Sequence, residues 1–258
     1  MSSLNDSLKK ITIIEILIVI IALVGVLLLF EIINHPLSTD WIYVGIIFYF
    51  IYRLRFFGSE FIDDAKNIFS IVSAKSILTT VLVNVFFSYG MLYLSIFAVK
   101  YIPGFDSLIG WFMAPIIVTN SLMGLGGILS TIIVSPISEE LLFRGVFLNR
   151  LKLVVPTSFA VAITSILFGS LHSYGSIISA IVFGVCMCIL YLKTKNILVC
   201  IFAHFLNNLL AEILYHIDYG NLIFTNDIFI VVFSLLAIVS FYLIVISIRQ
   251  EWKYINRR

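Results

Sequence analysis

The sequence predicts an all-α, polytopic membrane protein, a bundle of about eight transmembrane helices. Of its 258 residues, 61% are hydrophobic and only 12% are charged, and the mean hydropathy is +1.13. A soluble domain is typically about 45–50% apolar and about 25% charged. Long apolar runs recur along the whole chain, and the cations gather in alternate loops between them. We therefore expect residues 1–258 to form a single multi-pass membrane domain.

A helix that crosses a bilayer needs roughly 20 apolar residues. Eight segments approach this length; the second is short, and the fourth is long and interrupted by Pro136. The predicted spans are 11–34, 41–56, 76–99, 122–149, 156–172, 175–192, 196–217 and 227–248. The first run is longer than the core of a signal peptide, about 7–15 residues, and lacks a clear cleavage site, so we expect it to be retained.

Two segments between the spans suggest helices that do not cross. Residues 53–75 mix charges with Phe and Ile, which is typical of a helix lying along the membrane interface. Residues 104–121 form a second interfacial or re-entrant candidate.

The cations predict the orientation, because Lys and Arg collect in cytoplasmic loops. With both termini placed in the cytoplasm, fourteen of the sixteen cations fall on the cytoplasmic side. Of the other two, Lys100 lies on the opposite side and Arg144 lies within a span. The predicted topology is eight helices with N and C termini cytoplasmic. The net charge of +2 and the lack of a Lys/Arg run predict no nucleic-acid partner.

The stretch SPISEELLFRG places Glu139, Glu140 and Arg144 inside the fourth span. Charged groups at the centre of a bilayer cost several kcal/mol and by default indicate function. Residues four apart share a helix face, so Glu140 is expected to pair with Arg144. Glu139 is rotated about 100° from Glu140 and is expected to stay free. A salt bridge that only fixes helix packing would explain Glu140 and Arg144, but not Glu139.

Two further spans supply possible partners: His172 ends the fifth, and His204 and Asn208 share one face of the seventh. Depth in the membrane is counted from the nearest cytoplasmic cation or helix start at about 1.5 Å per residue. On this count all of the polar positions fall in one layer near mid-membrane: Glu139, His172, His204 and Asn208. We expect a polar intramembrane cavity. The three cysteines lie in apolar runs without the spacing of a metal knuckle or a disulfide framework, and we expect them to be small buried or lipid-facing residues.

Such a cavity suits amide hydrolysis. A buried Glu can act as a general base, and with a neighbouring His it can deprotonate a water. His204 and Asn208 can donate hydrogen bonds to the resulting oxyanion. Alternatively, Glu139, His172 and His204 can bind Zn²⁺ with an open position for water. HExxH, GxSG and paired membrane aspartates are all absent from the sequence.

These residues resemble the CAAX protease and bacteriocin-processing family (CPBP, or Abi-type, intramembrane proteases). Its motifs EExxxR, FxxxH and HxxxN or HxxxD correspond in order to Glu139-Glu140…Arg144, Phe168…His172 and His204…Asn208. The motif-bearing core spans about 122–217, and the N-terminal helices carry no family signature.

The resemblance implies an active-site cavity open to the cytosol and a glutamate-dependent intramembrane endopeptidase without a cofactor, although zinc dependence has been argued for the family. Glu139 would be the general base and His172 its water-positioning partner. His204 and Asn208 would form the oxyanion site, with Glu140 and Arg144 supporting it.

The substrate implied by the resemblance is a membrane-associated peptide or protein. It is either a peptide, pheromone or bacteriocin type or one trimmed at a CAAX-like C-terminus. The Ile- and Phe-rich, Ala-poor composition favours the first kind and a bacterial plasma membrane. The oligomeric state is not predicted.

Two other classes stay open. A non-catalytic scaffold or bacteriocin-immunity protein would use the polar cluster only for helix packing. An ion or proton transporter would use the buried Glu and His as a relay. No inverted repeat or matched pair of broken helices supports the transporter.

Overall fold

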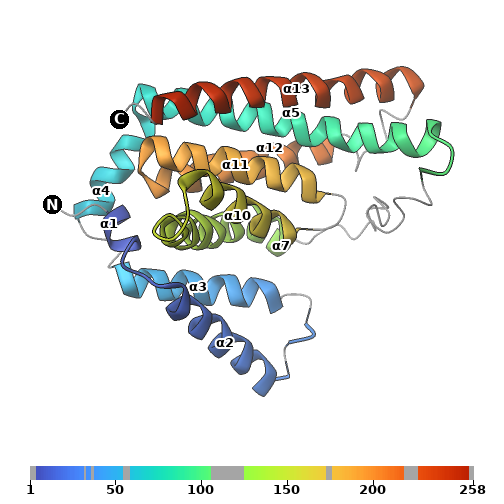
Figure 1. Cartoon of the computed structure of the whole chain (residues 1–258). Coiled ribbons are helices and arrows are strands. Elements are labelled where there is room, and N and C mark those ends of the chain that lie inside the picture. The colour runs from blue at the N-terminus through green and yellow to red at the C-terminus, as the bar shows by residue number, and fades with distance from the viewer. Residues whose placement is uncertain are drawn as a thin grey trace.

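The computed structural model describes residues 4–31, 33–35, 38–54, 59–105, 125–172, 176–217 and 226–255. Within these ranges the chain is almost entirely helical and contains no strand (Figure 1), which confirms the all-α fold class. The helices are α1 (Leu4–Leu8), α2 (Ile13–Leu29), α3 (Ser38–Leu54), α4 (Ser59–Lys66), η1 (Asn67–Phe69), α5 (Ile71–Tyr101), α7 (Leu125–Leu129), η2 (Ser130–Val134), α8 (Ser135–Glu140), η3 (Leu141–Leu148), α9 (Asn149–Leu151), α10 (Thr157–Ser170), α11 (Ile177–Thr194), α12 (Ile197–Ile217) and α13 (Asp227–Ile255).

Each of the eight predicted spans lies on one of these helices, and α7 to α9 join into one continuous helix, which we call the motif helix. Five helices in the described ranges are long and apolar enough to cross a membrane: Val72–Tyr101, Gly126–Leu151, Ile177–Thr194, Ile197–Ile217 and Asp227–Ile255. The first, second and fifth predicted spans, on α2, α3 and α10, are shorter helices of 17, 17 and 14 residues. The number eight therefore stays a prediction.

The predicted interfacial segment 53–75 contains α4 and η1 and overlaps the start of α5, which begins five residues earlier than expected. The side chain of Ser70 caps α5 by accepting a hydrogen bond from the backbone N–H of Ser73. Residues 106–121 of the second interfacial candidate lie outside the described residues.

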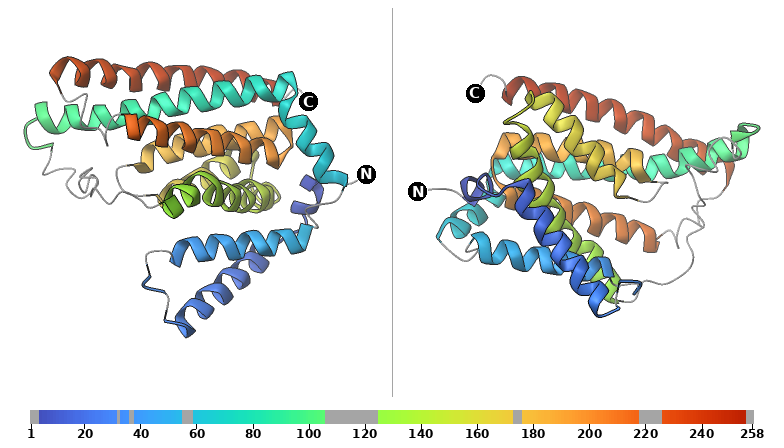
Figure 2. Two further views of the ribbon diagram at one scale, coloured as in Figure 1. Left: turned by 180° about the vertical axis from the view of Figure 1, so that it is seen from behind. Right: turned by 60° about the horizontal axis from the view of Figure 1, so that its bottom comes forward.

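Figures 1 and 2 show α5 and α13 running side by side along one edge of the bundle, with α11 and α12 beneath them and the α2–α3 hairpin on the opposite side. The α5–α13 pair packs closely at Gly90, where a Cβ atom would come within 2.4 Å of the backbone nitrogen of Ala237. A second close approach joins α10 and α11 at Ser165 and Gly184. Small residues at such crossings let helix backbones approach where lipid offers no hydrophobic driving force.

The outer faces of the bundle carry large apolar side chains. On α2 and α13, residues such as Leu29, Ile14 and Ile228 expose more than two thirds of their surface. A soluble protein seldom leaves so much contiguous apolar surface uncovered, whereas a lipid environment covers it without cost. The exposed faces therefore agree with a multi-pass membrane protein.

Helix α1 and the C-terminal end of α13 lie at the same end of the bundle (Figures 1 and 2). This arrangement fits an even number of crossings. Which side of a membrane this end faces stays a prediction from the cations.

Candidate active site

The first motif lies on the motif helix: Glu139 and Glu140 are between two π-helical segments, Ser130–Val134 and Leu141–Leu148, and Arg144 is within the second. In the first of them, the N–H of Ser135 bonds to the carbonyl of Ser130, five residues back. The next bond of this ladder would need an N–H on Pro136, which proline lacks. The carbonyl of Thr131 is therefore left for another donor. π-helical turns of this kind occur frequently at functional sites.

The predicted Glu140–Arg144 ion pair is present and completely buried. Arg144 Nη1 donates to Glu140 Oε1 at 2.8 Å, and Nη2 donates to the carbonyl of Gly184 on α11 at 3.2 Å. The guanidinium also lies over the ring of Phe168, 4.6 Å from its centroid. Arg144 thus ties the motif helix to α10 and α11.

Phe168 of the second motif is the aromatic centre of the site. Its ring contacts those of Phe143, His172 and His204, at centroid distances of 5.3, 4.6 and 6.0 Å. One apolar side chain therefore touches residues from all three motifs.

Glu139 is nearly buried, and its two carboxylate oxygens differ. Oε1 accepts hydrogen bonds from the hydroxyl of Tyr43 on α3, at 3.0 Å, and from the hydroxyl of Ser135. Oε2 is buried and has no hydrogen-bond partner in the part of the chain that the structure describes. The expectation that Glu139 would stay free holds for Oε2 only, because the sequence does not reveal the hydroxyl donors that reach Oε1.

His204 lies between the two glutamates. Its Nδ1 is 2.8 Å from Glu140 Oε1, and its Nε2 is 3.9 Å from Glu139 Oε2. An ionised carboxylate only accepts hydrogen bonds, so Nδ1 carries the proton and donates to Glu140. In the neutral ring Nε2 is then a lone pair facing Glu139. His204 can donate from Nε2 only as the imidazolium.

His172 lies just beyond α10, which ends at Ser170 rather than at the histidine. Its Nδ1 is 3.0 Å from the carbonyl of Phe168, an acceptor, so Nδ1 carries the proton and Nε2 is the basic nitrogen. Both His172 and Glu139 are described, and no hydrogen bond or ion pair joins them. Its role in positioning water stays a prediction.

Asn208 satisfies the carbonyl that Pro136 leaves free. Its amide Nδ2 donates to the carbonyl of Thr131 at 2.9 Å, which fastens α12 to the first π segment. One of its two N–H groups is thereby used. The predicted oxyanion contact would have to come from the other.

The zinc alternative gains no support from the described residues. Among the described residues, no group of three or more His, Cys, Asp or Glu side chains could hold a metal ion. Glu139 and His204 approach each other, whereas no ion pair or hydrogen bond joins the described side chain of His172 to either of them. A cofactor-free site stays a prediction.

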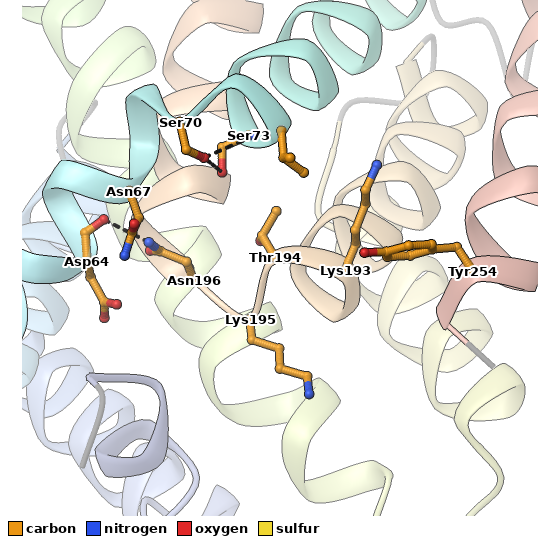
Figure 3. Close-up of a pocket in the computed structure, with 10 residues that line it drawn as sticks. Asp64, Asn67, Ser70, Ser73, Lys193, Thr194, Lys195, Asn196 and Tyr254 are labelled. Atoms are coloured by element: carbon orange, nitrogen blue, oxygen red, sulfur yellow. Dashed lines mark hydrogen bonds between the residues drawn. The ribbon is translucent and has the colours of Figure 1, made fainter. Parts of the chain in front are cut away.

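A cavity among the described residues lies elsewhere. It has a volume of about 270 Å³ at the end of the bundle where α5 begins and where α11 turns into α12 (Figure 3). The side chain of Asn196 spans this region and donates to the backbone carbonyl of Asp64 at 2.8 Å. None of its lining residues belongs to the motifs, so the predicted polar cavity around Glu139 stays a prediction.

The contacts of Tyr43 and Ser135 with Glu139 were not predicted from the sequence. Ser135 lies one helical turn before Glu139 and was detectable by i, i+4 spacing. Tyr43 is 96 residues away on a helix without a motif, and no local signal marks it.

Fold and site define an all-helical multi-pass membrane protein with a buried carboxylate–imidazole cluster. Residues 120–210 match the family model for type II CAAX prenyl endopeptidase Rce1-like proteins, which is the CPBP/Abi family that the motifs predicted. No curated protein and no solved structure matches the chain significantly. The match covers all three motifs, and the matched segment is similar to a family of proteases.

Proposed function

We propose that this protein is an intramembrane endopeptidase that hydrolyses a peptide bond of a membrane-associated peptide or protein with water activated by Glu139. The observation that carries the proposal is the asymmetry of the Glu139 carboxylate. Oε1 is held by two hydroxyl donors, while Oε2 is buried, has no hydrogen-bond partner among the described residues and faces the imidazole of His204. The match to a family of CAAX prenyl endopeptidases supports the same chemistry.

The reaction follows from these positions. Glu139 Oε2 takes a proton from water, and the hydroxide oxygen attacks the carbonyl carbon of the scissile bond. The oxyanion accepts a hydrogen bond from Nε2 of His204, which carries a proton there only in the imidazolium form, and from the remaining N–H of Asn208. The C–N bond then breaks, and the leaving amine takes the proton from Glu139. The products are a carboxylate and an amine, so no redox step or cofactor is needed.

Glu140 and Arg144 have a supporting role in this scheme. No hydrogen bond or ion pair joins their described side chains to Glu139, and their further contacts go to His204, Gly184 and the Phe168 ring. It orients the imidazole and joins the helices that carry the motifs. His172 presents a basic Nε2, which suits a second contact to the attacking water.

Two substrate classes are open: a prenylated C-terminal CAAX segment, or an unmodified peptide or membrane-protein segment of the pheromone or bacteriocin type. We favour the second class on composition alone. The family model's description names prenyl endopeptidases, which makes the first class the natural reference substrate.

The test uses the purified full-length protein in lipid nanodiscs and an internally quenched CAAX peptide, farnesylated or unmodified. Wild type is expected to cleave at least one of them. Glu139→Gln is expected to lower the rate by roughly 10³-fold, because a general base typically contributes about 10²–10⁴-fold to the rate. Glu212→Gln, on α12 outside the motifs, is the matched control and should keep the wild-type rate.

Three outcomes contradict the proposal. Activity of Glu139→Gln near that of wild type would remove Glu139 from the chemistry and favour a scaffold. Loss of wild-type activity on adding a metal chelator, with recovery on adding Zn²⁺, would show that the cofactor-free mechanism is wrong. If neither peptide is cleaved, wild type and Glu139→Gln are compared in cells by their profiles of new protein C-termini. New C-termini that appear with wild type but not with Glu139→Gln identify the substrate. Identical profiles reject proteolysis.

A further inference from the structure

We propose that Tyr43, which lies outside all three motifs, is a positioning residue that selects the working oxygen of Glu139. Together with Ser135 it occupies Oε1, and it thereby leaves Oε2 as the atom that takes the proton from water. The inference rests on the proposed function and adds a residue from the N-terminal helices to its site.

The two hydroxyl donors converge on one atom from different elements. Tyr43 reaches Oε1 from α3 at 3.0 Å, and Ser135 reaches it from the preceding turn of the motif helix. Ser135 alone would hold the carboxylate to its own helix only. The phenol adds a fixed point on a second helix, so the carboxylate plane cannot rotate without breaking a bond.

The backbone of Tyr43 is also fastened to the motif helix. Its carbonyl accepts a hydrogen bond from the hydroxyl of Ser138 at 3.1 Å. One turn earlier on α3, the carboxylate of Asp40 accepts a hydrogen bond from Ser130. Because unmade polar contacts are costly in an apolar environment, these bonds hold α3 in one register against the motif helix. These bonds therefore pre-organise the phenol of Tyr43 for its hydrogen bond to Glu139.

Around Glu139, the hydrogen bonds to Oε1 come from neutral hydroxyl donors and not from the neighbouring charged and titratable groups. From α12 comes His204, whose Nε2 faces Oε2 at 3.9 Å. On the motif helix itself, Glu140 and Arg144 are engaged with each other. Tyr43 comes from α3, with Asp40 one turn away. A cation on Oε1 would neutralise the base, whereas a phenol orients it and leaves its charge available for water.

The test compares Tyr43→Phe, Ser135→Ala and the double variant with wild type in the nanodisc assay, on whichever peptide wild type cleaves. Each single variant is expected to lower kcat by about tenfold, the equivalent of one hydrogen bond to a charged group, with KM within twofold of wild type. The double variant should lose less than the product of the single effects, because both donors serve one oxygen. Tyr52→Phe is the matched control: Tyr52 lies on α3, is 83% exposed and should leave kcat unchanged.

The outcomes separate this inference from the proposed function. If kcat of Tyr43→Phe stays within twofold of wild type while Glu139→Gln is inactive, the inference is wrong and the function stands. An active Glu139→Gln variant rejects the function itself. If Tyr43→Phe melts well below wild type, the test depends on Ser135→Ala, because this variant leaves α3 intact. An unchanged kcat of Ser135→Ala then overturns the inference.

Discussion

At the scale of single residues, the site is organised by carboxylate oxygens that take different partners. Glu140 Oε1 accepts hydrogen bonds from both Arg144 and His204, whereas Glu139 Oε1 accepts two hydroxyl donors. Adjacent glutamates therefore have different electrostatic environments: one is paired with a cation, and the other is held by neutral groups. This difference suits a division into a supporting and a reacting carboxylate.

Removal of Arg144 tests the supporting carboxylate. Arg144→Leu leaves Glu140 without its guanidinium partner in a site with no exposure, where only the hydrogen bond from His204 remains, so we expect destabilisation by about 3–5 kcal/mol. Arg144→Lys keeps the charge but cannot present a planar fork to Glu140 and the Gly184 carbonyl together, and should be intermediate. Thermal unfolding in detergent measures the effect, with the exposed Arg249→Leu as control. A variant Arg144→Leu that melts with wild type would show that the pair does not stabilise the fold.

Residue spacing predicted the Glu140–Arg144 pair and failed for the contacts between distant residues. An i, i+4 rule applies within one helix, so that pair could be inferred from the sequence. The bonds from Tyr43 to Glu139 and from Asn208 to Thr131 join residues 96 and 77 positions apart. These bonds depend on which helix faces meet, and apolar composition alone does not determine that.

At the scale of elements, the motif helix departs from regular α-geometry on both sides of the glutamates. Pro136 marks the first π segment in the sequence, and it was expected only to interrupt a span. The chain instead stays helical through Leu151, because Asn208 satisfies a carbonyl near the proline. At the other end, Asn149 donates to the carbonyls of Arg144 and Gly145. Side-chain donors thus replace regular backbone bonds around the site.

The five long helices were predictable because apolar runs of sufficient length read directly as spans. The short α1 was not, since Leu4 and Asn5 lie before the first long apolar run. In the structure Asn5 accepts a hydrogen bond from Tyr191, whose hydroxyl accepts one from Asn149 at 2.7 Å. This chain of buried polar groups anchors α1 against the end of the motif helix.

The α5–α13 pair provides a test of packing at this scale. Gly90→Ala places a methyl group 2.4 Å from the Ala237 nitrogen, a backbone atom that cannot move aside alone. The helices must separate, and we expect a cost of about 1–3 kcal/mol, as for an overpacked core. Gly25→Ala on α2 meets nothing within 4 Å and is the matched control. Equal melting temperatures of the two variants would show that the helices do not pack closely at Gly90.

At the scale of the whole molecule, basic residues from separate loops gather at the end of the bundle that holds α1 and the end of α13. Burial, together with the ammonium groups of Lys9 and Lys195, lowers the pKa of Lys152. Three loops that are distant in sequence therefore meet at one end, as the positive-inside rule requires of a cytoplasmic face. The rule indicates the side, whereas the structure shows only that the residues share an end.

The predicted topology is tested by single cysteines and a membrane-impermeant maleimide. Lys152→Cys is expected to react only in inverted vesicles and Lys100→Cys only in intact cells, because the two lie at opposite sides of the predicted membrane. His35→Cys, between α2 and α3, should react in intact cells if these 17-residue helices cross. At about 1.5 Å per residue each is about 25 Å long, slightly less than a typical hydrocarbon core of about 30 Å, so crossing requires local thinning of the bilayer.

The background for this experiment is a chain with its three cysteines replaced by alanine. Two of them, Cys188 and Cys200, are buried and should react little even in wild type. Labelling of His35→Cys from the cytoplasmic side would place the α2–α3 hairpin within one leaflet and reduce the number of crossings by two. Both termini would then still share one side, and α3 would still carry Tyr43 to Glu139, so the site does not depend on the hairpin crossing the bilayer.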